Sequence, residues 1–190
     1  MNIYHRWRCA SARWRETVHR FMMPSVVGDK PIGDDVLEIG PGPGATTDWL
    51  RARVQHLTSI EIDPKLASSL RSRLEGTNVT VVEGDATKMP FPDASFSGAV
   101  SLTMLHHVPS AELQDRLFAE TCRVLRPGGL FVGGDSTPSF GWNIAHLFDT
   151  RVPVDPDTLA ERLERAGFTG AKVTRGGGRS RYFMFLARKP

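Results

Sequence analysis

Residues 36–47 read Val36-Leu37-Glu38-Ile39-Gly40-Pro41-Gly42-Pro43-Gly44-Ala45-Thr46-Thr47. The apolar residues at the start of this stretch predict a buried strand. The glycines that follow predict a tight turn, because a residue without a Cβ lets the backbone turn sharply and approach a ligand closely. The last residues predict the first turn of a helix, which presents unpaired N–H groups and the positive end of the helix dipole. The stretch therefore predicts a strand, turn and helix that hold a nucleotide-like ligand.

Strands and helices alternate along the chain that follows. We expect strands at 35–39, 57–62, 79–82, 96–102 and 130–134, and helices at 46–53, 64–75, 111–125 and 156–166. Asp63, Ser110 and Asp155 are the expected helix N-caps. The alternation predicts a parallel sheet covered on both faces. The last two strands, 171–175 and 181–187, are joined by a short glycine-rich link, which can connect only antiparallel strands. The sequence thus predicts an α/β, doubly wound, mostly parallel sheet with an antiparallel C-terminal hairpin.

The first thirty residues are expected to form an amphipathic helix. Apolar residues recur there at three- and four-residue steps, at Ile3, Trp7, Ala10, Trp14, Val18 and Phe21. We expect this helix to end at Met23-Pro24, where a linker begins. Residues 1–30 are interpreted as a helical lid, and residues 31–190 as the main body of one globular domain.

Composition and charge argue against a secreted, membrane-spanning or metal-binding protein. The 190 residues carry 24 Lys and Arg against 21 Asp and Glu, a formal net charge of +3. Arginines near both ends are compatible with an anionic partner, although scattered arginines are more typical of a solvated surface. Cys9 and Cys122 are too far apart in the sequence to match a metal-ligand motif, and we expect both to be reduced thiols. With no signal peptide and no apolar run near ~20 residues, we expect a cytoplasmic protein without a membrane span or metal site.

Two carboxylates are expected beside the glycine turn, at the ends of the next two strands. In a parallel α/β sheet, ligands bind at the carboxyl ends of the strands. Glu61 ends the second strand and can accept ribose hydroxyls. Asp85, in Gly84-Asp85-Ala86, can accept the exocyclic amine of adenine, while the Ala86 N–H reaches a ring nitrogen. Each residue alone could be a strand-end or turn residue, but together they predict adenosine bound across three adjacent strand ends.

The order of these motifs resembles that of the class I S-adenosylmethionine-dependent methyltransferases, and most closely their small type 11 members. The resemblance covers about residues 30–190 and rests on Glu38-x-Gly40-x-Gly42-x-Gly44, Glu61-Ile62-Asp63, Gly84-Asp85-Ala86, residues 101–108 and Arg126-Pro127-Gly128-Gly129. It implies a seven-stranded, Rossmann-like sheet whose last strand is inserted antiparallel. It also implies S-adenosylmethionine as the cofactor.

The resemblance further implies which residues hold each part of the cofactor. Its methionine portion would lie on the glycine turn, near the carboxylate of the first strand and the main chain that ends the fourth. Its ribose would be held by Glu61, and its adenine would be contacted by Ile62, Asp85, Ala86 and Met89. The cofactor-binding residues implied are Glu38, Gly40, Pro41, Gly42, Gly44, Glu61, Ile62, Asp85, Ala86, Met89, Ser101 and Leu102.

Parts of the sequence are also compatible with a different ligand or a different acceptor. A dinucleotide such as NAD would suit Gly40-x-Gly42-x-x-Ala45, but prolines remove two N–H groups from the turn and Asp85 has no role. The first two motifs are also similar to those of the ribosomal RNA adenine dimethylases. Those enzymes place an Asn-x-Pro-Tyr/Phe type motif after the fourth strand, where this chain has residues 101–108 without it. This departure favours a small-molecule acceptor over nucleic acid.

Methyl transfer requires chiefly that the acceptor be aligned, which can be worth ~7–11 kcal/mol of barrier. A base is needed only when the acceptor must lose a proton. The candidates are His106 and His107, after the fourth strand, and Asp135, at the end of the fifth. Alternatively, one of the two histidines packs under the following helix and the other is solvated. Aromatic residues in the N-terminal helix and in residues 136–154 suggest a flat or apolar acceptor, although a helix packed on a core would show the same residues. They are Tyr4, Trp7, Trp14, Phe140, Trp142, His146 and Phe148. A module that binds the cofactor without turnover is the remaining alternative.

Overall fold

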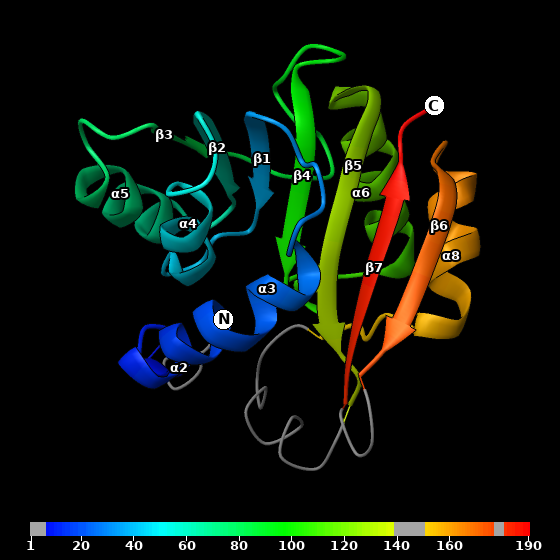
Figure 1. Ribbon diagram of the computed structural model, residues 1–190, viewed down its shortest axis with the longest axis horizontal. Coiled ribbons are helices and arrows are strands. Elements are labelled where there is room, and N and C mark those ends of the chain that lie inside the picture. Colours follow the sequence, from blue (N-terminus) through cyan, green and yellow to red (C-terminus); the bar gives the residue numbers. More distant parts are fainter. Residues whose placement is uncertain (1–6, 139–150, 177–180) are drawn as a thin grey trace.

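The computed structural model describes residues 7–138, 151–176 and 181–190 (Figure 1). Within these residues, seven strands form one sheet in the order β3-β2-β1-β4-β5-β7-β6. The strands are β1 (Asp35–Ile39), β2 (His56–Glu61), β3 (Val79–Glu83), β4 (Phe96–Leu102), β5 (Leu125–Ser136), β6 (Thr169–Arg175) and β7 (Tyr182–Arg188). The first five are parallel, and β7 lies antiparallel between β5 and β6. The predicted fold, including the hairpin, is confirmed.

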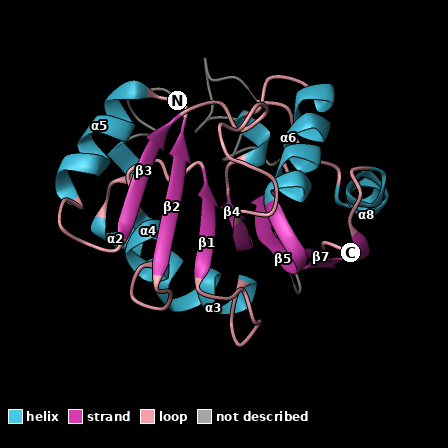
Figure 2. Cartoon of the chain, turned by 90° about the horizontal axis from the view of Figure 1, so that it is seen from above, coloured by secondary structure: helices cyan, strands magenta, loops and turns pink. Residues whose placement is uncertain are grey.

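Helices cover both faces of the sheet, as Figure 2 shows for α6 and α8 on one side and α3 and α4 on the other. Their bounds are α3 (Met23–Val26), α4 (Ala45–Leu50), α5 (Pro64–Arg73), α6 (Ala111–Val124) and α8 (Pro156–Arg165). Neighbouring residues of a strand point to opposite faces. Leu37 accordingly packs in the cluster that holds Phe118 of α6, while Val36 packs in the cluster that holds Leu50 of α4. The two clusters form the cores on either side of the sheet.

The three predicted helix N-caps are present. Asp63 Oδ1 accepts the N–H groups of Lys65 and Leu66 at 2.9 and 3.1 Å. Ser110 caps α6 and Asp155 caps α8 in the same way, each accepting one N–H. These caps fix where α5, α6 and α8 begin, because they satisfy donors that the helix itself leaves unpaired.

The N-terminal segment differs from the single helix predicted for it. Residues 7–9 are helical, and a new helix, α2 (Ala12–Thr17), begins at Ser11, whose Oγ accepts the N–H of Trp14 at 3.2 Å. A π-helical stretch, η1 (Val18–Met22), then leads directly into α3. The expected stop at Met23-Pro24 is wrong, because Pro24 stands in the first turn of α3, where its missing N–H is tolerated. Ile3 and Tyr4 lie outside the described residues.

The fifth strand begins earlier than predicted. Leu125 already pairs with Phe96, and Leu130 pairs with Gly98, so residues 126–129 bulge opposite a single residue of β4. Pro127-Gly128-Gly129, expected to lie between the helix at 111–125 and the strand at 130–134, therefore belongs to β5 as an irregularity. The aromatic residues predicted to line an acceptor pocket within 139–150 (Phe140, Trp142, His146 and Phe148) lie outside the described residues. In the part of the chain that is described, none of the helices has the length and apolar character that crossing a bilayer requires.

Candidate active site

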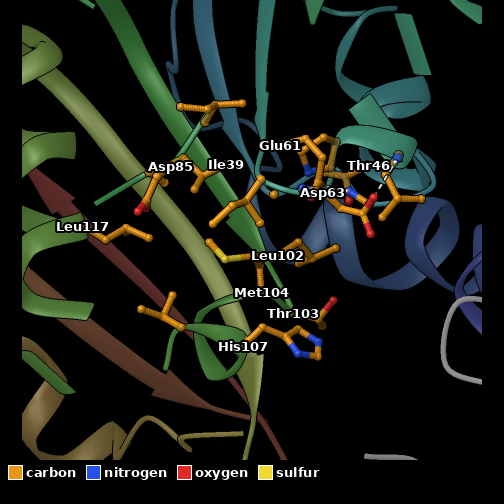
Figure 3. A pocket seen from close by; sticks show the side chains of 18 of the residues that line it. Ile39, Thr46, Glu61, Asp63, Asp85, Leu102, Thr103, Met104, His107 and Leu117 are labelled. Atoms are coloured by element: carbon orange, nitrogen blue, oxygen red, sulfur yellow. Dashed lines mark hydrogen bonds between the residues drawn. The ribbon is translucent and has the colours of Figure 1, made fainter. Parts of the chain in front are cut away.

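A cavity of about 350 Å³ opens at the carboxyl ends of β1, β2, β3 and β4 (Figure 3). The glycine turn, Glu61 and Asp85 line it, as the sequence predicts for a ligand at the strand ends. The N-terminal segment contributes Cys9 and Trp14. The volume of the cavity falls in the range typical of small-molecule and cofactor sites, about 300–1,000 Å³.

The glycine turn adopts left-handed backbone conformations. Gly40 has a φ of 68° and Gly42 a φ of 54°, which most residues with a Cβ adopt only at a cost. A Cβ on Gly40 would stand 2.2 Å from Cγ of Met104, whereas a Cβ on Gly42 would meet nothing within 4 Å. Gly42 therefore leaves bare backbone at the cavity, while Gly40 is also required for packing.

Two backbone N–H groups, one on the glycine turn and one just after β2, hold the side chain of Glu61 in place. Its Oε2 accepts the N–H of Gly42 at 2.9 Å, and its Oε1 accepts the N–H of Asp63 at 3.0 Å. The side chain is buried, with the residue 6% exposed. Because a carboxylate offers about four acceptor positions, each oxygen can accept a further hydrogen bond. Glu61 is thus an oriented acceptor rather than a loosely solvated strand end.

Asp85 stands across the cavity from Glu61 (Figure 3). One of its oxygens, Oδ1, accepts the N–H of Thr87 at 2.8 Å and so closes a turn. Asp85 therefore closes a turn, as a structural residue would, and also lines the cavity, as a ligand-binding residue would. Ala86 also lines the cavity, as does Ile62, which is 68% exposed. An apolar side chain as exposed as Ile62 is suited to cover a flat apolar ligand.

Glu38 lies behind the cavity and does not line it. Its Oε2 accepts the hydroxyls of Thr47 at 2.7 Å and Ser59 at 2.6 Å. The residue is 1% exposed, and burial raises its pKa from 4.5 to about 7. Glu38 thus joins β1, β2 and α4 beneath the glycine turn.

Three further predicted residues do not line the cavity. Met89 packs in the core cluster with Ile60 and Phe96, because its side chain turns inward from the loop after β3. Ser101 is 1% exposed within β4, and only its neighbour Leu102 reaches the cavity. Gly44 is the N-cap of α4, with a φ of 91°. Pro41 does line the cavity.

The three predicted catalytic residues lie together, but only His107 lines the cavity. His106 is 2% exposed, and its Nδ1 lies 2.6 Å from Oδ1 of the fully buried Asp135. Asp135 also accepts the backbone N–H of His106 at 3.1 Å and that of Ser136 at 2.7 Å. The rings of His106 and His107 lie with their centroids 4.2 Å apart.

Comparison with known proteins identifies the family. Residues 37–133 match the sequence family described as "Methyltransferase domain". The chain belongs to this family. The predicted likeness to small class I, S-adenosylmethionine-dependent methyltransferases of type 11 is thereby confirmed.

The chain is similar to proteins whose names give different acceptors. It is 38% identical over 90 residues to the ribosomal RNA small subunit methyltransferase A of Methylibium petroleiphilum, covering 46% of this chain and 34% of the relative. It is 31% identical over 110 residues to the fatty-acid O-methyltransferase of Mycolicibacterium smegmatis, covering 57% and 39%. The chain thus spans little more than a third of the length of these relatives.

The fold of the chain is shared along its whole length with a solved structure. The SAM-dependent methyltransferase of Aquifex aeolicus superposes with a TM-score of 0.77, covering 100% of both chains at 16% identity. At this identity the likeness concerns the fold alone.

Sequence reasoning missed several residues that line the cavity. Thr103 and Met104 follow β4, and Leu113 and Leu117 belong to α6. Thr103 has a φ of 49°, which is rare for a β-branched residue and marks local strain. The signal available was the position of residues 101–108 after a strand, which places their side chains at the binding edge. Within the described residues, no group of three or more His, Cys, Asp or Glu side chains is arranged to hold a metal ion.

Proposed function

We propose that the methyltransferase transfers a methyl group from S-adenosylmethionine to a small, apolar acceptor. One observation carries this proposal: a single cavity combines two carboxylates at the ends of neighbouring strands with an apolar wall made by α6 and the N-terminal segment. The carboxylates fit the adenosine of the cofactor, and the apolar wall fits the acceptor.

The residues around the cavity fit the cofactor. Glu61 is oriented to accept the ribose hydroxyls, and Asp85 with Ala86 can contact the adenine edge. The bare backbone at Gly42, where a Cβ would meet nothing, leaves room for the methionine portion. The cofactor supplies an already activated methyl group, so the chain has to align the acceptor and exclude water.

The apolar wall supports a small acceptor. Trp14, Met104, Val108, Leu113 and Leu117 line the cavity. Lining of this kind, with few polar groups, is typical of pockets that bury most of a small ligand. The similarity to a fatty-acid O-methyltransferase is in keeping with such an acceptor.

The N-terminal segment is proposed to act as the lid that excludes water. Trp14 of α2 lines the cavity, and two contacts fasten the segment to α4. Arg15 lies 3.9 Å from Asp48, and Nε2 of His19 lies 2.8 Å from the backbone oxygen of Ala45. These contacts hold the segment against the first turn of α4, which begins directly after the glycine turn.

Nucleic acid and NAD are less well suited to this cavity. Among its described lining residues there is no Lys or Arg, whereas Glu61, Asp63 and Asp85 all contribute carboxylates. Phosphate contacts to RNA, or to the pyrophosphate of a dinucleotide, rely on cations and backbone N–H groups. The similarity to a ribosomal RNA methyltransferase nevertheless makes RNA the acceptor to test against.

The test is transfer of a labelled methyl group. The protein is incubated with S-adenosylmethionine labelled in its methyl group, together with a cell extract divided into small-molecule, protein and RNA fractions. Label in the small-molecule fraction is the expected result. Label confined to RNA would contradict the proposed acceptor, and bound cofactor without transfer to any fraction would indicate a binding module.

A further inference from the structure

Among the described residues, His107 and Thr103 place polar groups at the far end of the cavity. Figure 3 shows both below Met104, away from the Glu61 and Asp85 carboxylates. Val108 and Leu113 line the same cavity. An acceptor that fills this apolar end therefore meets an imidazole and a hydroxyl, the former being suited to proton transfer near neutral pH.

Asp135 holds the buried ring of His106, and the ring of His107 lies against that ring. Asp135 is fully buried and accepts three hydrogen bonds, two of them from His106. With the carboxylate as the acceptor, Nδ1 of His106 carries its proton, so the orientation and tautomer of that ring are fixed. The ring of His107 lies against it at 4.2 Å between centroids. His106 and Asp135 are thus positioning residues, and His107 is the group that reaches the cavity.

Backbone strain is concentrated at the same end. Thr103 keeps its left-handed conformation while its N–H donates to the Gly134 oxygen at 2.8 Å, on the strand that also carries Asp135. Strain in a β-branched residue persists only where the surroundings impose it, and it is frequent at functional sites. Two features therefore meet at the acceptor end: the imidazole of His107, whose ring lies against the fixed ring of His106, and the strained, hydroxyl-bearing Thr103.

Building on the proposed function, we propose that His107 is the general base of this methyltransferase and that the acceptor is an apolar molecule bearing a weakly acidic hydroxyl, such as a phenol. The hydroxyl oxygen forms the new bond to the methyl carbon. The electron pair of the methyl–sulfur bond stays with sulfur, which becomes neutral, and the hydroxyl proton moves to His107. A carboxylic acid is already ionised at neutral pH and needs no base. An ammonium would have to be desolvated among Met104, Val108 and Leu113, and the described residues that line this end of the cavity offer no carboxylate to pair with it.

The experiment compares two phenols that differ in whether they need a base. The probes are 4-methylphenol, which is neutral under the assay conditions, and 4-nitrophenol assayed above its own pKa, where it is ionised. His107→Gln is expected to lower kcat for 4-methylphenol by roughly 10²–10⁴ and to leave kcat for ionised 4-nitrophenol nearly unchanged. Asp135→Asn should lower kcat for 4-methylphenol by a smaller factor, with the KM for cofactor unchanged. His56→Gln is the matched control, because His56 is a surface histidine at the start of β2 that pairs with Asp35.

Each other outcome has a defined meaning. Equal losses on both phenols would overturn the role of His107 as a base and leave it a packing residue. Methylation of decanoic acid or benzylamine with no methylation of either phenol would overturn the acceptor class, as would no methylation of any probe by a protein that binds S-adenosylhomocysteine. Failure to bind S-adenosylhomocysteine would instead contradict the proposed function. Affinity for S-adenosylhomocysteine also shows whether each variant is folded, and His107→Asn replaces His107→Gln if the latter fails this check.

Discussion

Oε2 of Glu61 accepts the N–H of Gly42 at 2.9 Å, so the carboxylate that ends β2 holds the glycine turn that follows β1. Its other oxygen accepts the N–H of Asp63, which caps α5. One side chain thereby sets the relative positions of the turn, the end of β2 and the start of α5. The site proposed for the ribose and the site proposed for the methionine portion are built as one unit.

Replacing Glu61 should therefore affect both binding and stability. Glu61→Ala removes the ribose acceptor, and we expect the Kd for S-adenosylhomocysteine to rise by roughly 10- to 100-fold, the worth of one hydrogen-bonded charge. It also leaves two backbone N–H groups without their acceptor, so the free energy of unfolding should fall by about 1–3 kcal/mol. Glu83→Ala is the matched control, because Glu83 is the exposed register partner of Glu61 on β3. Equal affinities in the two variants would show that the ribose lies elsewhere.

Asp85 is predicted to distinguish adenine from other bases. In Asp85→Asn the amide replaces an acceptor-only carboxylate, while the side-chain oxygen can still accept the Thr87 N–H. Isothermal titration should show that the native protein prefers S-adenosylhomocysteine to S-inosylhomocysteine, which lacks the exocyclic amine. The variant should lose most of this preference. An unchanged preference in the variant would assign Asp85 to the turn alone.

Glu38 should make stability depend on pH. Burial raises its pKa in the folded chain from 4.5 to about 7, so the unfolded chain loses this proton first as the pH rises. The free energy of unfolding should therefore fall between about pH 4.5 and pH 7, by up to roughly 3 kcal/mol, and change little from this cause at higher pH. Glu38→Gln keeps the shape without the titration and should lack this fall. Urea unfolding across this pH range tests it, and parallel curves for the two proteins would contradict it.

Trp14 should matter to binding more than another aromatic residue of the same segment. Trp14→Ala opens the proposed lid, and we expect the Kd for S-adenosylhomocysteine to rise by roughly tenfold, in keeping with the loss of a large apolar contact. Phe21→Ala is the control, because Phe21 is 64% exposed and does not line the cavity. Deleting residues 1–20 would be a poorer test, since it removes the fully buried Val18. Equal affinities in the two substitutions would argue against a lid.

The parts of the fold that depend on local chemistry could be predicted from the sequence. Asp63, Ser110 and Asp155 cap helices because a short side-chain oxygen before a helical stretch satisfies its first N–H groups wherever it occurs. The short link before β7 required an antiparallel strand. By contrast, the break at Ser11 depends on a cap inside an apolar repeat that otherwise predicts one helix. The start of β5 at Leu125 depends on pairing with Phe96, a contact between distant residues.

Those residues of the candidate site whose position depends only on where a strand ends could be predicted from the sequence. Glu61, Asp85 and the glycine turn reach the cavity because the carboxyl ends of parallel strands share one edge of the sheet. Met89 and Asp135 turn away from it into the interior, which depends on the packing around each side chain. Glu38 also lies away from the cavity. A strand residue points to one face of the sheet or the other, and on its own face Glu38 meets Thr47 and Ser59.

The most direct test of the central claim is isothermal titration of the intact chain with S-adenosylhomocysteine and, separately, with NAD. We predict one S-adenosylhomocysteine per chain, weakened in Glu61→Ala and Asp85→Asn, and no saturable binding of NAD. Binding of NAD without binding of S-adenosylhomocysteine would contradict the account.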